Sequence, residues 1–464
     1  MAGIGFILRK LAKKDSLSGM AYAYFHGILA SSAPWISTVI ALGTIYLLTR
    51  TLHLSGGQEV FRAIVLYNFC FSLVFSATLT VIATRYIADH IYLRDLRSVP
   101  AMFFKVLILN AILVLPIVVW FYGFYTDLTL INRILAVFNF YLCLFIWLST
   151  VFISTLKTYK GVSFSFIGGM AIGVIFAFLF ANSYGSTGML MGFNFGLLIV
   201  VASLIALLLV EYPKCYIPPK NFFSFFKKHI KLALSGTFYT LAIWVDKWIL
   251  WTAPEAERLP SGFWVYTNYD NAMFIAYLTV IPSLAMFLIS QETAFYERYI
   301  KYYKDILNNA NYSKIRENQE KLMGSIHYHG RNLMIMQFGI AAIVILFAPK
   351  IFVLFSINYI QLSIFRFGVI GASFQILSLF LIITNSYFEN RKVLDISLLF
   401  FTSNVLFTLI TLKLGFPYYG IGYCLSCILT FVYSAILLEE FVRILPYHTF
   451  ITTNEAVNYK DSIE

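Results

Sequence analysis

The sequence predicts an all-α polytopic membrane protein with about twelve transmembrane helices in two six-helix bundles. Apolar residues make up 60% of the 464 residues and charged residues only 12%. That charged fraction is about half of what soluble domains carry. Runs of about 20 apolar residues, each long enough to cross a hydrocarbon core of about 30 Å, recur along the whole chain. Basic residues gather in alternate connecting segments, as expected for a chain that crosses a membrane repeatedly.

Hydropathy divides the chain into successive spans. The first begins too late and is too long for a cleaved signal peptide. The ninth contains Pro349 and Lys350, so a broken or re-entrant helix is possible there. The predicted spans are Gly27–Leu48, Ala63–Thr84, Ala101–Trp120, Leu135–Thr155, Val162–Ala181, Gly188–Val210, Leu232–Ala253, Ala272–Ser290, Leu333–Phe355, Phe367–Thr384, Val393–Leu414 and Tyr419–Leu438.

The distribution of charge predicts the orientation. If the N-terminus is cytoplasmic, most of the 34 Lys and Arg residues fall on inside segments. This asymmetry predicts a multi-pass protein of the cytoplasmic (inner) membrane with both termini in the cytoplasm. The net charge of +12 is therefore a topology signal, and no nucleic-acid partner is expected. The bilayer is the expected surrounding of most of the chain.

The spans divide into two halves of six. We predict an N-terminal bundle over residues 1–213 and a C-terminal bundle over residues 214–464, joined by the basic connector 211–231. "LSGMAY" (17–22) precedes the first half and "LSGTFY" (234–239) opens the second. This echo is consistent with parallel repeats that both enter from the cytoplasm.

The largest segment outside the membrane, residues 291–332, is predicted to be cytoplasmic and to begin with an amphipathic helix. Tyr296, Tyr299 and Tyr303 follow each other at three- and four-residue spacing and so share one face. This face either packs against the membrane or the protein's own bundle, or docks a cytosolic partner. The sequence leaves both possibilities open.

No pattern of residues indicates catalysis. The chain lacks the G-x-x-x-x-G-K-[ST] phosphate loop, so it is not expected to hydrolyse ATP. No nucleophile–base pattern and no convincing set of metal ligands emerge. We therefore expect a transporter or a transport-complex subunit, not an enzyme, without a cofactor or metal.

An Asp-Lys pair interrupts the seventh predicted span. A charge at the centre of a bilayer costs roughly 2.5–3.5 kcal/mol, so Asp246 and Lys247 need an explanation. Neighbours in sequence point about 100° apart around a helix and do not face each other as i,i+4 residues do. We expect Lys247 to extend outward to the membrane interface and Asp246 to find a partner elsewhere. Asp246 then either fixes helix packing or lines an aqueous path.

Four further residues are candidates for the transport path. Asp270 and Glu292 flank the eighth predicted span near the two interfaces, where simple solvation is the alternative explanation. Trp244 and Trp251 lie close to the Asp-Lys pair. Aromatic rings can stack on sugars, which is compatible with a glycan path.

Four residues are candidates for structural or gating roles. Arg85 and Asp89 in "TRYIAD" have the i,i+4 spacing of a helical ion pair. Trp35 follows the "SSAP" segment, and Pro282 lies inside the eighth predicted span.

Several stretches of the chain are distinctive: "MAGIGFILRKLAKKDSL" with "SSAPW", "TRYIAD", "IWVDKWILW" (243–251), "YDNAMFIAYLTVIPSLAMFLISQETAF" (269–295) and "YHTFI" (447–451). Together they resemble the PelG family, the polytopic membrane component of the Pel exopolysaccharide system. They occur in the family's order along essentially the full chain. One departure is Ala33, where the family is expected to carry Gly.

The resemblance implies a fold like that of the multidrug (MATE) and polysaccharide flippases, with two six-helix bundles around a central cavity. It also implies a cytosolic glycosyltransferase partner (PelF-like) that uses a UDP-activated N-acetylhexosamine. Further implied partners are membrane subunits (PelD-like and PelE-like), one of which confers stimulation by cyclic di-GMP. The implied substrate is a growing polymer of the N-acetylgalactosamine and galactosamine type.

Three functions remain in competition. The leading one is translocation of a growing exopolysaccharide, coupled to the glycosyltransferase. The second is a flippase or cation-coupled antiporter of a lipid-linked sugar or small molecule. The third is a scaffold that activates the glycosyltransferase and conducts nothing.

Overall fold

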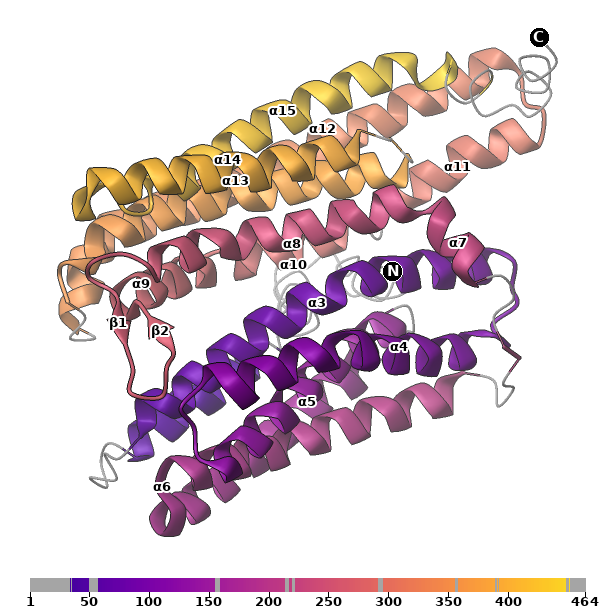
Figure 1. The fold of residues 1–464 in the computed structure, drawn as a ribbon. Coiled ribbons are helices and arrows are strands. Elements are labelled where there is room, and N and C mark those ends of the chain that lie inside the picture. Colours follow the sequence, from indigo (N-terminus) through magenta and orange to yellow (C-terminus); the bar gives the residue numbers. More distant parts are fainter. Residues whose placement is uncertain are drawn as a thin grey trace, which may run out of the picture.

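The computed structural model describes residues 34, 36–49, 57–154, 159–212, 217–218, 222–290, 295–354, 358–388, 390, 392–447 and 450. Its long helices lie side by side, with the earlier part of the chain on one side and the later part on the other (Figure 1). Of the candidate residues, Trp35 and Glu292 lie outside the described residues.

The first half is a set of packed helices. Residues Ile36–Thr49 form a shorter apolar helix. The elements that follow are α3 (Gln58–Tyr92), α4 (Val99–Trp120) with a π-helical end η1 (Phe121–Tyr125), α5 (Leu130–Ser154) and α6 (Tyr159–Glu211).

The second half begins after the short helix α7 (Phe222–Lys228). A small antiparallel hairpin, β1 with β2, interrupts its helices. The elements are α8 (Ile230–Leu250), β1 (Glu257–Arg258), β2 (Trp264–Val265), α9 (Thr267–Leu278), α10 (Ile281–Ser290), α11 (Tyr296–Leu307), α12 (Tyr312–Leu354), α13 (Gln361–Tyr387), α14 (Val393–Leu414), η3 (Phe416–Tyr418) and α15 (Ile421–Tyr447).

The predicted membrane architecture is confirmed in its main features. Among the described residues, 8 helices are long and apolar enough to cross a membrane, or up to 9 if α9 and α10 count as one bent span. The fifth and sixth predicted spans both lie in α6, which reverses direction at Gly185, where φ is 55°. The exact number of twelve and the cytoplasmic position of the termini stay predictions.

The break in the second half does not lie where the sequence suggested. Helix α12 continues through Pro349 to Leu354. The break falls in the eighth predicted span, where α9 and α10 meet at 41°. Pro282 is the second residue of α10; its ring and missing N–H prevent α9 from continuing as one regular helix. In a long membrane helix such as α12, by contrast, a proline can be accommodated by its surroundings.

Helix α8 joins the two halves. It packs chiefly against α14 of the second half and α3 of the first, and Figure 1 shows it between them. The amide of Asn404 on α14 donates to the carbonyl of Ala242 at 2.8 Å. On the other side, the hydroxyls of Thr78 and Thr237 lie 2.8 Å apart. Helix α8 and its side chains are therefore held by both halves. The proposed division at residue 213 stays a prediction.

Candidate functional site

The charged pair of α8 is buried inside the protein. Asp246 is 0% exposed and Lys247 is 5% exposed. The Nζ atom of Lys247 lies 3.5 Å from Oδ2 of Asp246, and the same carboxylate oxygen accepts a hydrogen bond of 2.7 Å from the hydroxyl of Tyr269 on α9. Asp246 thus has a cation and a donor within reach.

Two sequence-based expectations about this pair are wrong. Lys247 does not extend outward to the interface, and the two side chains do interact. The reason is the length of the lysine stem, which bends back along the helix. Its Nζ donates to the carbonyl of Ile243, one turn earlier, at 3.2 Å. The angle between neighbouring Cβ atoms therefore does not decide whether their charges meet. Asp246 does have a second partner elsewhere in the protein, Tyr269 on α9.

Aromatic rings enclose the ammonium group. Nζ of Lys247 lies 5.2 Å from the ring centroid of Trp244 and 5.0 Å from that of Tyr277, within the range of a cation–π attraction. Within the described part of the chain, three buried polar atoms here have no hydrogen-bond partner: Oδ1 of Asp246, Nε1 of Trp244 and the Tyr277 hydroxyl. Buried polar atoms usually find partners, so this unused hydrogen-bonding capacity is available to water or a ligand.

Asp270 lies next to this cluster and is not simply solvated. Nε1 of Trp251 donates to its Oδ2 at 3.0 Å. The Trp251 ring stacks on Tyr67 of α3, with centroids 4.6 Å apart. The Tyr67 hydroxyl in turn donates to the carbonyl of Trp264 at 2.7 Å. Trp251 therefore links Asp270 to the first half of the protein.

A second pair of stacked rings joins α8 to α3, one turn of α8 away from Trp251. The rings of Trp248 and Phe71 are nearly parallel, at 7°, with centroids 5.1 Å apart. Nε1 of Trp248 approaches Sγ of Cys70 at 3.2 Å. Trp248 and Trp251 thus fasten α8 to α3; a sugar-stacking role for Trp251 stays a prediction.

Sequence reasoning missed Tyr269, the residue that joins α9 to Asp246. The available signal was its position next to Asp270 in "YTNYDN". A tyrosine in a membrane helix buries its ring readily, but its hydroxyl needs a partner, so a nearby buried carboxylate is a natural acceptor.

Tyr269→Phe is expected to lower the thermal stability of the protein. The change removes the donor at 2.7 Å from Asp246, and leaving a buried acceptor short of a bond costs about 1–3 kcal/mol. Tyr266→Phe is the matched control, because the buried Tyr266 hydroxyl has no partner among the described residues. Thermal unfolding of both purified variants in one detergent checks this. Equal midpoints for the two variants would contradict it.

Three of the structural and gating candidates, Arg85, Asp89 and Pro282, lie among the described residues. Arg85 and Asp89 form the predicted ion pair at 3.1 Å on α3. Pro282 stands at the bend between α9 and α10.

The tyrosines of α11 pack against other parts of the protein. The Tyr299 hydroxyl donates to the carbonyl of Tyr387 on α13 at 2.9 Å, and its ring packs on Tyr303 with centroids 4.8 Å apart. Tyr302, which the sequence analysis did not select, is fully buried, and Tyr296 is half-buried. This supports the possibility that the face packs against the protein's own bundle.

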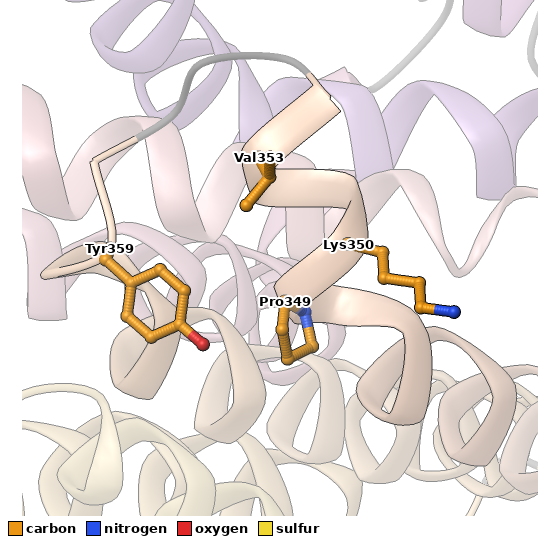
Figure 2. Close-up of a pocket in the computed structure, with 4 residues that line it drawn as sticks. All are labelled: Pro349, Lys350, Val353 and Tyr359. Carbon is orange, nitrogen blue, oxygen red and sulfur yellow. The ribbon is translucent and has the colours of Figure 1, made fainter.

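Two surface clefts border α12, and neither includes the Asp246 cluster. One, of about 410 Å³, is lined by Pro349, Lys350, Val353 and Tyr359. Figure 2 shows that the Lys350 side chain extends away from Tyr359. The other, of about 490 Å³, lies between α12 and α13. No group of three potential metal ligands occurs among the described residues.

Comparison with protein families gives a match over almost the whole chain. Residues 1–450 match the family described as "PelG: Putative exopolysaccharide Exporter (EPS-E)". The chain belongs to the PelG family. The resemblance seen in the sequence is thereby confirmed over nearly the full length. No curated protein gave a significant match.

Solved structures show the same fold. An MOP superfamily transporter from Pyrococcus furiosus matches with a TM-score of 0.64 at 16% identity, over 90% of this chain and 96% of that one. An outward-facing multidrug resistance MATE family transporter matches with 0.61 at 17% identity, over 91% and 96%. A MATE in its bent conformation matches with 0.62 at 15% identity, over 95% and 98%.

These matches confirm the MATE-like fold. A PelG-family chain with this fold and many apolar helices is a multi-pass membrane protein with a transport role rather than an enzyme.

Proposed function

We propose that this protein carries a growing exopolysaccharide across the cytoplasmic membrane, coupled to a cytosolic glycosyltransferase. The observation that carries the proposal is the family match over residues 1–450. The polymer would be Pel-like, of the N-acetylgalactosamine and galactosamine type. Further Pel-type membrane subunits (PelD-like and PelE-like) would complete the complex.

The Asp246 cluster supports a transport role. It is a buried group of charge and aromatic rings on the helix that both halves hold, and three of its polar atoms have no partner in the described structure. Asp246 is closed off from solvent in this conformation. A substrate or ion would reach it only after α8 moves relative to α3 or α14, so the cluster is suited to gating.

Docking of the glycosyltransferase is assigned to the cytoplasmic segment 291–332. Because Tyr299 and Tyr303 pack inward, the outward side of α11 is the better candidate. It presents Glu297, Arg298, Lys301 and Lys304. Charged surfaces of this kind speed and orient the encounter of two proteins.

Reconstitution tests the proposal. The full-length chain is placed in sealed vesicles, and the glycosyltransferase and its nucleotide sugar are added outside. We expect polymer inside the vesicles, where an added glycan hydrolase cannot reach it. Polymer that is made but remains entirely outside would favour the scaffold and overturn translocation.

The antiporter is the second candidate, favoured by the fold shared with multidrug transporters and by the buried Asp246. It predicts uptake of a small molecule by the purified protein alone, abolished by an uncoupler. Translocation of a growing polymer predicts no transport without the glycosyltransferase.

A further inference from the structure

The short helix α7, which connects the two halves, has one face on the protein and one face turned away. Inward, the Phe225 ring meets Tyr86 of α3 edge to face, with centroids 5.5 Å apart. Nζ of Lys105 on α4 lies 4.8 Å from the Phe222 ring centroid. Phe223 is 68% exposed, although its ring centroid lies 5.8 Å from the same Nζ. Lys227, one turn later on the side of Phe223, is exposed, and so is Lys228.

The loop from α3 to α4 adds a second exposed apolar group at the same end of the molecule, where Figure 1 places α7. Tyr92 is 77% exposed and Leu93 is 67% exposed. Arg94 follows them, also exposed, with a φ of 55°. Aromatic and aliphatic groups beside cations, at the ends of membrane-spanning helices, are the composition that suits the membrane interface.

Two acidic residues next to this surface, Asp89 and Asp95, are already neutralised. Asp95 is bound by Arg97, with a contact of 2.9 Å, which holds the pKa of that carboxyl below its usual range. Asp89 pairs with Arg85 at 3.1 Å. Over the described residues, no carboxylate forms an ion pair with the cations of this end: Arg94, Lys227, Lys228 and Lys231.

We propose that α7 and the α3–α4 loop form a binding surface for anionic phospholipid, with Phe223, Tyr92 and Leu93 in the apolar part of the leaflet and Arg94, Lys227, Lys228 and Lys231 at the phosphates. Cations that form no ion pair with a carboxylate favour anionic over zwitterionic headgroups. The exposed rings favour a lipid over a soluble polyanion, because only a lipid provides an apolar region in which the rings are buried. The surface holds the connector between the halves at a fixed depth in the membrane.

A lipid titration tests this on the purified full-length chain. Native mass spectrometry would follow binding of phosphatidylglycerol and phosphatidylcholine with identical acyl chains. The test variant is Lys227→Gln with Lys228→Gln and Lys231→Gln. Each basic residue near an anionic surface raises the binding constant by roughly fivefold. We therefore expect the apparent affinity for phosphatidylglycerol to fall by about tenfold or more. Affinity for phosphatidylcholine should stay the same.

The matched control removes three exposed cations far from this surface: Lys350→Gln with Arg366→Gln and Lys413→Gln. We expect it to bind both lipids like the wild type. Equal loss in test and control variants, or no loss in the test variant, would overturn the proposal. So would a test variant that keeps its lipid preference but no longer captures the glycosyltransferase, which would make this a protein-docking surface. The titration needs no export activity, so its result is independent of the proposed function.

Discussion

Asp246→Asn is expected to lower exopolysaccharide export while the protein still inserts into the membrane. Export should fall by about tenfold or more, the effect of losing roughly 1.4 kcal/mol from a rate-limiting step. The physical reason is the position of the carboxylate on α8, the helix between the two halves. Its Oδ2 lies 3.5 Å from Nζ of Lys247 and accepts a hydrogen bond of 2.7 Å from the hydroxyl of Tyr269 on α9. Secreted and cell-associated polymer, measured at matched protein levels, checks the result.

The single substitution alone does not separate transport from stability. Removing one partner of a buried ion pair leaves the other charge uncompensated and typically costs about 3–5 kcal/mol. The double variant Asp246→Asn with Lys247→Met removes both charges and keeps much of the lysine's volume. Replacing a buried pair by groups of similar volume is often neutral for stability. We therefore expect the double variant to regain the wild-type thermal midpoint.

The export level of the double variant then decides the role of Asp246. If the carboxylate acts in transport, export stays low although stability is restored. If the pair only fixes helix packing, export returns together with stability, and the transport assignment fails. Lys247→Met alone is the complementary variant, because it leaves Asp246 in place without its cation.

Hydropathy could predict the spans of the protein but not how each begins, bends or turns back. The apolar runs over α3, α4 and α5 are long and continuous, so their helices follow from composition. The break between α9 and α10 depends on Pro282 and on the local closing of the last turn of α9. Two prolines in apolar helices, Pro282 and Pro349, look alike in sequence; only the packing around them decides which helix breaks.

The candidate site was predictable in its charges but not in its connections. Asp246 stands out because a carboxylate in an apolar run is costly. Its contact with Lys247 depends on a side-chain conformation that bends back to Ile243, which residue spacing does not reveal. Its contact with Tyr269 depends on how α9 crosses α8. Such contacts are set by tertiary packing, so sequence periodicity leaves them open.

Glycine spacing was a sequence signal whose meaning appears only in the fold of α6. Gly169 and Gly173 lie on the first arm of this reversed helix, and Gly188, Gly192 and Gly196 lie on the second, each set at intervals of four residues. Residues four apart lie on one helix face, and small residues there let two membrane helices approach closely. A Cβ on Gly173 would lie 3.1 Å from the Cα of Gly196. The two arms thus meet backbone to backbone.

Gly192→Ala is expected to destabilise the protein strongly. A Cβ at this position would lie 2.0 Å from the backbone nitrogen of Ala177 and 2.3 Å from its Cα. Both atoms belong to the main chain, so no side-chain rotation relieves the clash and the two arms must separate. Overpacking of this kind costs about 1–3 kcal/mol or more. We expect a thermal midpoint lower by several degrees and a reduced yield of protein from the membrane.

Gly168→Ala is the matched control on the same helix. A Cβ there meets nothing within 4 Å, and alanine is favoured over glycine inside a helix by about 1 kcal/mol. The control should therefore keep or raise the thermal midpoint, while Gly192→Ala lowers it. The same chemical change thus gives opposite signs at two positions of one helix. If both variants raised the thermal midpoint, helix propensity rather than close packing of the two arms would govern the stability of α6.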